Sequence, residues 1–136
     1  MSRRRGASFS GTLNDKMEGH FNKLEGVYSP AQARRGETLY KQHCASCHGA
    51  TLEGSETATA LAGADFIDKW NRQTVGDLLE RIAKTMPLDK PGRLSRQVSA
   101  DITAFLLNRN QFPNGQAELT PDIQALKQIR IEPKSQ

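Results

Sequence analysis

The sequence contains few cysteines, few aromatic residues and no long apolar run. Its 136 residues include 2 cysteines and 1 tryptophan, and 6% are aromatic. Two cysteines alone cannot supply the four ligands of a structural zinc site, and no stretch is long enough to span a membrane. The segment from Gly6 to Asn14 also lacks the apolar core of a secretory signal. Because only 36% of the residues are hydrophobic, the chain predicts one domain with a thin core of its own.

The chain is basic, with a formal net charge of +4 and a pI near 9.3. Its basic residues are scattered, apart from Arg3-Arg4-Arg5 near one end and the pair Arg34-Arg35. Scattered cations among few aromatic residues do not form the patch that nucleic-acid binding requires. We therefore expect no nucleic-acid partner and interpret the basic character as a solvated surface that can steer an acidic redox partner.

Both cysteines belong to one five-residue segment, Cys44-Ala45-Ser46-Cys47-His48. Thiols at this spacing can each bond to a vinyl group of one haem, and the histidine that follows is then placed to bind the iron. The motif predicts one haem c, covalently bound through Cys44 and Cys47, with His48 as an iron ligand. Such a cofactor supplies apolar mass that the chain lacks, so we expect the apo-chain to fold poorly.

Other uses of the two thiols fit the sequence less well. A Cys₂His₂ zinc site would need His20 or His43 beside His48, without the second ligand pair at zinc-finger spacing. A redox dithiol of the thioredoxin kind belongs in a βαβ pattern, and no such alternation is visible. A disulfide between Cys44 and Cys47 would close a loop too short to add much stability.

Composition and capping signals divide the chain into three parts. We expect an N-terminal extension over residues 1–28, partly helical on a weak periodicity, a haem domain over 29–115, and a C-terminal tail with a short helix over 116–136. The haem domain begins at Ser29, which can cap a helix running to about His43. In that helix Pro30 suits the first turn, and Gln32 can complete a capping box with Ser29.

Three further segments carry helix signals. The first has Thr74 as its cap and ends at Met86-Pro87, because the residue before proline is disfavoured in helical geometry. The next has apolar residues at helical spacing from Val98 and stops near Asn110, and a short one follows Thr120-Pro121. No segment has the pattern of a strand. The expected fold class is all-α, with three to five helices and long loops around one covalently bound haem.

A histidine-ligated haem iron has one further axial position, and what fills it decides the function. Met86 is the favoured ligand, because it lies at a helix end well beyond the attachment motif and carries a soft thioether. The alternative is that Met86 is simply the last core residue of an amphipathic helix. His20 and His43 remain further alternatives as the sixth ligand, and both otherwise fit ordinary surface histidines.

From about Gly26 to Gly115 the chain resembles the class I cytochromes c, and more narrowly the small monohaem domains that accompany quinoprotein dehydrogenases. The matching elements are Gln32 to Gly36 with Tyr40, Cys44 to Gly49, Leu61-Ala62-Gly63 with Phe66 and Trp70, Met86-Pro87 with Pro91-Gly92 and Leu94-Ser95, and Asp101-Ile102 through Asn110 to Pro113.

The resemblance implies a role for several residues. His48 would be the proximal ligand and Met86 the distal one. The family's first and last helices cross at a glycine–aromatic contact, which here would bring Gly36 and Tyr40 to Phe105 and Leu106. Trp70 could pack on the haem edge and donate its indole N–H to a propionate, or it could be a core residue.

The chain departs from the family's pattern at one place. Many relatives have a proline just before the Leu-x-Gly segment, where a loop carbonyl orients the proximal histidine. Here Thr57-Ala58-Thr59-Ala60 precedes Leu61, and the proline is absent. The carbonyl could still come from Ala58 or Thr59, and such a bond would fix the tautomer of His48.

With both axial positions filled, the sequence predicts one-electron transfer and no catalysis on a substrate. The expected partners are redox proteins: a dehydrogenase donor, such as a quinoprotein dehydrogenase, and an oxidase or another cytochrome as acceptor. The chain could also be a module of a larger dehydrogenase. The alternative is a haem-based gas sensor or a peroxidase-like enzyme with an open sixth site. We expect a periplasmic or other extracytoplasmic location, with a signal, anchor or further domain outside this sequence.

Overall fold

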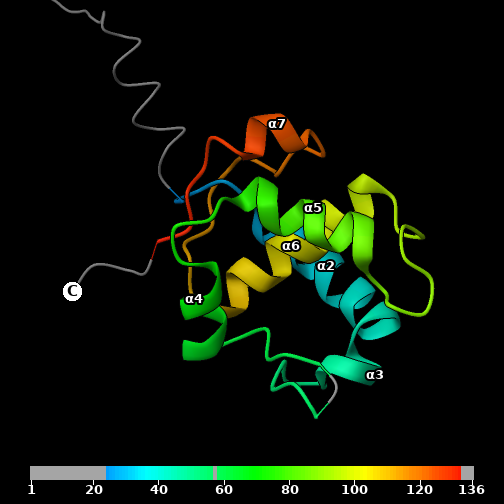
Figure 1. Cartoon of the computed structure of the whole chain (residues 1–136). Coiled ribbons are helices and arrows are strands. Elements are labelled where there is room, and N and C mark those ends of the chain that lie inside the picture. Colours follow the sequence, from blue (N-terminus) through cyan, green and yellow to red (C-terminus); the bar gives the residue numbers. More distant parts are fainter. Residues whose placement is uncertain (1–23, 57, 133–136) are drawn as a thin grey trace, which may run out of the picture.

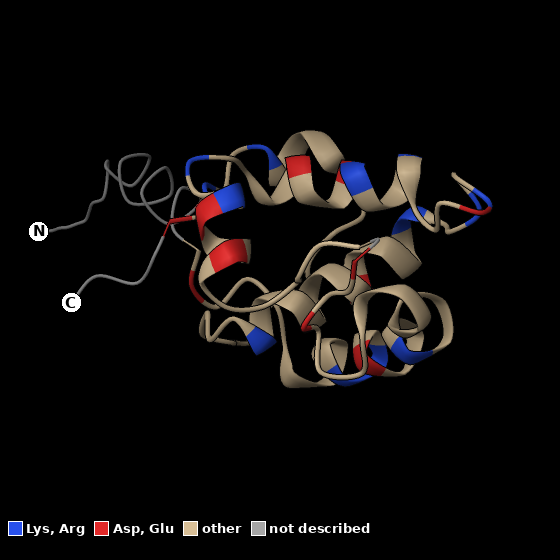
Figure 2. Ribbon diagram, turned by 60° about the horizontal axis from the view of Figure 1, so that its bottom comes forward, with Lys and Arg blue, Asp and Glu red and all other residues tan. Residues whose placement is uncertain are grey.

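The computed structural model describes residues 24–56 and 58–132, and this part of the chain is helical without strands (Figure 1; Figure 2). An isolated bridge joins Thr74 to Arg130. The expectation of an all-α fold is confirmed. The six helices of the described residues are α2 (Pro30–His43), α3 (Ala45–His48), α4 (Ala64–Trp70), α5 (Val75–Thr85), α6 (Arg96–Arg109) and α7 (Ile123–Leu126).

Helices α2 and α6 cross in close contact at Gly36. A Cβ atom at this position would lie 1.8 Å from the carbonyl oxygen of Asp101 and 2.9 Å from Cβ of Phe105. One turn further along α2, the ring of Tyr40 lies 5.3 Å from that of Phe105, centroid to centroid. Only glycine allows the two backbones to approach this closely. The crossing implied by the resemblance is confirmed.

Only one of the two hydrogen bonds of the expected capping box is present at the N-terminal end of α2. The backbone N–H of Gln32 donates to the Ser29 hydroxyl at 3.0 Å. The Gln32 side chain does not return to Ser29, so the predicted capping box is wrong. Instead its amide is buried and pairs with the backbone of Leu119, accepting from N–H at 2.7 Å and donating to C=O at 3.1 Å. Burial explains the difference, because the backbone of Leu119 needs partners there.

Helix α5 begins and ends where the sequence predicts. Thr74 and Asp77 form a reciprocal capping box, with both bonds at 3.0 Å. The helix ends at Thr85, and Met86 is its C-cap, directly before Pro87. The predicted third helix is also confirmed as α6, with Asn110 as its C-cap.

Two helices were not expected from the sequence. Helix α3 is a single turn inside the attachment motif, and α4 has seven residues and buries Phe66 and Trp70. The N-terminal extension that was expected to be partly helical lies almost entirely outside the described residues. Tyr28, by contrast, is fully buried, and its hydroxyl donates to the carbonyl of Phe112.

The segment after α6 belongs to the same hydrophobic core as the helices. Figure 1 shows it crossing the top of the molecule, with α7 above α5. Gly76 allows this contact, since a Cβ there would lie 2.6 Å from the carbonyl oxygen of Ile123. The predicted short helix is confirmed as α7. The apolar side chains that this segment buries are Phe112, Leu119, Ile123, Leu126, Ile129 and Ile131.

Candidate functional site

One helical turn presents both cysteines and the histidine of the motif. Cys44 follows directly on α2, because its N–H donates to the carbonyl of Tyr40 at 2.8 Å, and the N–H of His48 returns to the carbonyl of Cys44 at 3.0 Å. Cys44 is partly buried and Cys47 is exposed. Burial raises the pKa of the Cys44 thiol to about 11, so its surroundings favour an uncharged sulfur.

The imidazole of His48 is held by a loop carbonyl. Its Nδ1 lies 2.7 Å from the carbonyl oxygen of Thr59. A carbonyl oxygen can only accept, so Nδ1 carries the proton and Nε2 keeps a free lone pair. The expected carbonyl is therefore present, and it comes from Thr59 rather than Ala58. The geometry leaves the lone pair of Nε2 free to bind a metal ion.

Tyr40 connects the attachment turn to the helix crossing. Its hydroxyl donates to the carbonyl of Gly49 at 2.6 Å, directly after His48. Burial raises the pKa of the Tyr40 phenol to about 12, with a smaller effect from the neighbouring Cys44. The same ring contacts Phe105. The position of the motif is thus tied to the contact between α2 and α6.

Met86 is the C-cap of α5 and lies directly before Pro87. Its N–H donates to the carbonyl of Ile82 at 3.1 Å, and its side chain is partly buried. Figure 1 shows the loop after α5 extending away from the helices before it returns to α6. In that loop the Arg93 guanidinium lies 2.8 Å from Nδ1 of His43. Of the other two candidate ligands, His43 thus has a described partner, and His20 lies outside the described residues.

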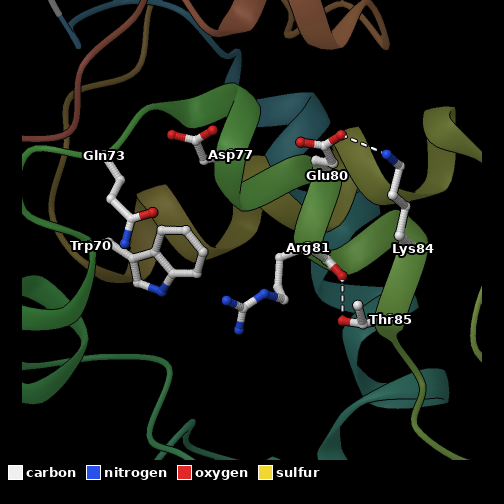
Figure 3. A pocket seen from close by; sticks show the side chains of 7 residues that line it. All are labelled: Trp70, Gln73, Asp77, Glu80, Arg81, Lys84 and Thr85. Carbon is white, nitrogen blue, oxygen red and sulfur yellow. Dashed lines mark hydrogen bonds and ion pairs between the residues drawn. The ribbon is translucent and has the colours of Figure 1, made fainter.

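Trp70 and Arg81 face one hollow of about 340 Å³ between α4 and α5 (Figure 3). The indole is buried, packs against Phe66 at 6.4 Å between ring centroids, and has the Arg81 guanidinium 5.6 Å from its own centroid. Lys84 pairs with Glu80 at 2.7 Å, whereas the ion pairs of the described residues include none with Arg81. The hollow therefore holds a cation without a carboxylate partner.

Sequence reasoning identified Trp70 and missed Arg81. Arg81 lies five residues before Met86 in a helix with alternating charges, and a single arginine in such a helix usually faces solvent. Only the fold brings the guanidinium over the indole. No sequence signal distinguishes Arg81 from its neighbour Lys84.

The comparisons with known proteins agree with this geometry. The family profile described as "Cytochrome C oxidase, cbb3-type, subunit III" matches residues 31–106, which include the attachment motif, the Thr59 loop and Met86. The chain belongs to this family of c-type cytochromes. Within it, the fold and the single C-x-x-C-H motif mark a class I monohaem cytochrome.

Two curated relatives are cytochrome c subunits of the cytochrome bc1 complex. The protein from Corynebacterium efficiens is 27% identical over 93 residues, and the one from Corynebacterium diphtheriae is 28% identical over 93 residues. The match covers 68% of this chain in each case, but 31% and 32% of the relatives. The chain thus spans about a third of the length of these relatives.

A solved structure shares the fold. It is that of the sulfane dehydrogenase SoxCD from Paracoccus pantotrophus, with a TM-score of 0.56 and 23% sequence identity. The similarity covers 94% of this chain and 68% of that one. None of the described helices combines the length and apolar character needed to cross a membrane.

Membership of this family implies covalently bound haem c as the cofactor, and the residues fit it. Cys44 and Cys47 have the spacing that two thioether bonds require. The bond to Thr59 sets the tautomer of His48 and leaves Nε2 free, and the burial of Cys44 favours a sulfur without charge, as in a thioether. The thin core expected from composition is also consistent with a fold that gains apolar mass from its cofactor.

Proposed function

We propose that this cytochrome transfers single electrons between redox partner proteins, with His48 and Met86 as the two axial ligands of its haem. A haem iron held by two side chains cycles between ferrous and ferric states without binding a substrate. The observation that carries the proposal is the hydrogen bond from His48 Nδ1 to Thr59, which leaves Nε2 with a free lone pair in a fixed orientation. On this basis the chain is an electron carrier and not an enzyme.

The two ligands would act in different ways. The Thr59 carbonyl increases electron donation by the His48 imidazole, which favours the ferric state. Met86 contributes a soft thioether, which favours the ferrous state and raises the potential. Met86 is suited to this role because the α5 end fixes its backbone, while the loop after it begins at Pro87. The balance between the two ligands would set the working potential.

Trp70 and Arg81 would bind the haem propionates. An indole N–H and a guanidinium are both donors, and neither accepts a hydrogen bond. In Figure 3 both side chains reach into the same hollow. The support for this role is the absence of a carboxylate partner for Arg81 among the described ion pairs. A propionate there would neutralise the charge of Arg81, as Glu80 already neutralises that of Lys84.

The partners and the location belong to the same proposal. A dehydrogenase, such as a quinoprotein dehydrogenase, would donate electrons, and an oxidase or another cytochrome would accept them. The names of the relatives, which are subunits of a bc1 complex and a sulfane dehydrogenase, support a place beside larger redox proteins. Haem is attached to C-x-x-C-H motifs outside the cytoplasm, so the protein would work in the periplasm or another extracytoplasmic compartment.

Substitution of Met86 tests the axial assignment. We expect Met86→Ala to abolish the weak sulfur-to-iron absorption band of the oxidised holoprotein and to let the reduced form bind carbon monoxide. The matched control is Met17→Ala, which removes the other internal methionine and should change neither property. If Met86→Ala leaves the spectrum unchanged and the unmodified protein already binds carbon monoxide, the sixth site is open. The gas sensor or peroxidase-like enzyme would then be the better function.

A further inference from the structure

The loop that holds His48 has no proline between Leu52 and Leu61, and a side chain from α6 restrains the loop at the same place. Ala60 stands before Leu61, so proline does not restrict the backbone there. Several backbone bonds fold the loop onto itself, including Ser55 N–H to the Ala58 carbonyl at 2.8 Å and Leu61 N–H to the Leu52 carbonyl at 2.9 Å. These bonds shape the loop but do not connect it to the long helices.

Asn110 makes that connection from the end of α6. Its Nδ2 donates to the carbonyl of Leu61 at 3.0 Å, and its Oδ1 accepts from the N–H of Gly63 at 3.0 Å. Nδ2 also donates to the carbonyl of Leu106 at 2.8 Å, one turn back in α6. The amide uses both of its donors and one acceptor site, so its rotation is blocked. The Asn110 amide thus holds the loop backbone by hydrogen bonds on both sides of Ala62.

The two backbone groups that bind Asn110, on Leu61 and Gly63, lie close in sequence to the Thr59 carbonyl that holds His48. Leu61 is two residues after Thr59, and two residues span at most about 7 Å of extended chain. A restraint on the Leu61 carbonyl and the Gly63 N–H therefore also limits the movement of the Thr59 carbonyl. Without it, the restraints left on that oxygen, 2.7 Å from Nδ1 of His48, would be the backbone bonds within the loop, the Tyr40 bond to Gly49 and the buried side chain of Leu52.

We propose that Asn110 is a positioning residue for the proximal histidine, acting through the Leu61–Gly63 backbone to keep the Thr59 carbonyl on His48. This inference rests on the proposed role of His48 as an iron ligand. A firm bond to Nδ1 makes the imidazole a better electron donor and stabilises the ferric state. Asn110 thus helps to lower the midpoint potential, in a protein where no proline performs this task.

The test compares three variants of the holoprotein. Asn110→Ala removes the amide, Asn110→Asp keeps an acceptor for Gly63 but loses the donor to Leu61, and Asn114→Ala is the control at an exposed asparagine in the loop after α6. Two properties are measured: the midpoint potential, and the exchange rate of the His48 Nδ1 proton by NMR of the reduced protein. The midpoint potential does not respond to a loss of stability alone while the protein stays folded, and backbone amides of α6 measured in the same NMR experiment report any faster exchange that comes from global opening.

We expect Asn110→Ala to raise the midpoint potential by about 59 mV, which corresponds to a tenfold change in a one-electron equilibrium. The Nδ1 proton should exchange faster in both Asn110 variants, the added negative charge of Asn110→Asp should offset part of its rise in potential, and Asn114→Ala should change neither property. Unchanged potential and exchange in both folded Asn110 variants would overturn the proposal. If the unmodified protein lacks the sulfur-to-iron band, the Met86 assignment fails, while the Nδ1 exchange still decides the role of Asn110.

Discussion

The contact between α2 and α6 makes Gly36 the most sensitive position of the fold. In Gly36→Ala the new Cβ would lie 1.8 Å from the Asp101 carbonyl oxygen, where ordinary van der Waals contact begins at 3.4 Å. Alanine gains about 1 kcal/mol of helix propensity over glycine. Overpacking costs about 3 kcal/mol when backbone must move, and separating Tyr40 from Phe105 costs about 1 kcal/mol more. The clash therefore outweighs the propensity, and we expect a net loss of about 3 kcal/mol.

Thermal and urea unfolding of the holoprotein, followed by circular dichroism, measure this loss. At about 4 °C per kcal/mol for a chain of this size, Tm should fall by about 10 °C. Thr38→Ala, at an exposed position of the same helix, is the control and should change stability by less than about 0.5 kcal/mol. A Gly36→Ala protein as stable as the unmodified one would refute the close crossing of α2 and α6.

Two further predictions concern charge. The phenol of Tyr40 is uncharged when protonated, and burial raises its pKa from 10.0 to about 12, so its stabilising effect is complete below pH 10 and is lost as the pH rises toward 12. Urea titrations from pH 8 to 12 should show a loss of up to about 3 kcal/mol that Tyr40→Phe lacks; an equal loss in both proteins would contradict this. Arg81→Met keeps the apolar contact with Trp70 but removes the cation, so it should lower the midpoint potential. Because the propionate would lose its cation, the pH-dependent step of the potential should also move to higher pH in spectroelectrochemical titrations. Lys84→Met, whose lysine pairs with Glu80, should have a smaller effect, and equal shifts in the two variants would argue against a propionate at Arg81.

Local signals predicted the helices well where they agreed with one another. The signals for α5 are all local: Thr74 caps its start, and Pro87 follows its end. The sequence therefore determines both ends of this helix. Helix α4 was missed because seven residues are too few for a clear periodicity. It is stabilised by the burial of Phe66 and Trp70, which depends on the rest of the fold.

The candidate site shows the same division between local and distant effects. The motif itself predicted Cys44, Cys47 and His48 as one unit, because covalent chemistry fixes their spacing. The choice of Thr59 over Ala58 was beyond the sequence, since neighbouring carbonyls point in different directions and the loop decides which one faces His48. Arg81 and Asn110 depend on partners that the fold brings from distant segments, and no spacing rule finds them.

The central claim is that this cytochrome has a closed haem iron with one nitrogen and one sulfur ligand. The most direct test is the optical spectrum of the purified holoprotein, first oxidised and then reduced. We expect low-spin bands in both states, a weak sulfur-to-iron band in the oxidised state, and no change when carbon monoxide is added to the reduced protein. A high-spin spectrum that changes with carbon monoxide or cyanide would contradict it.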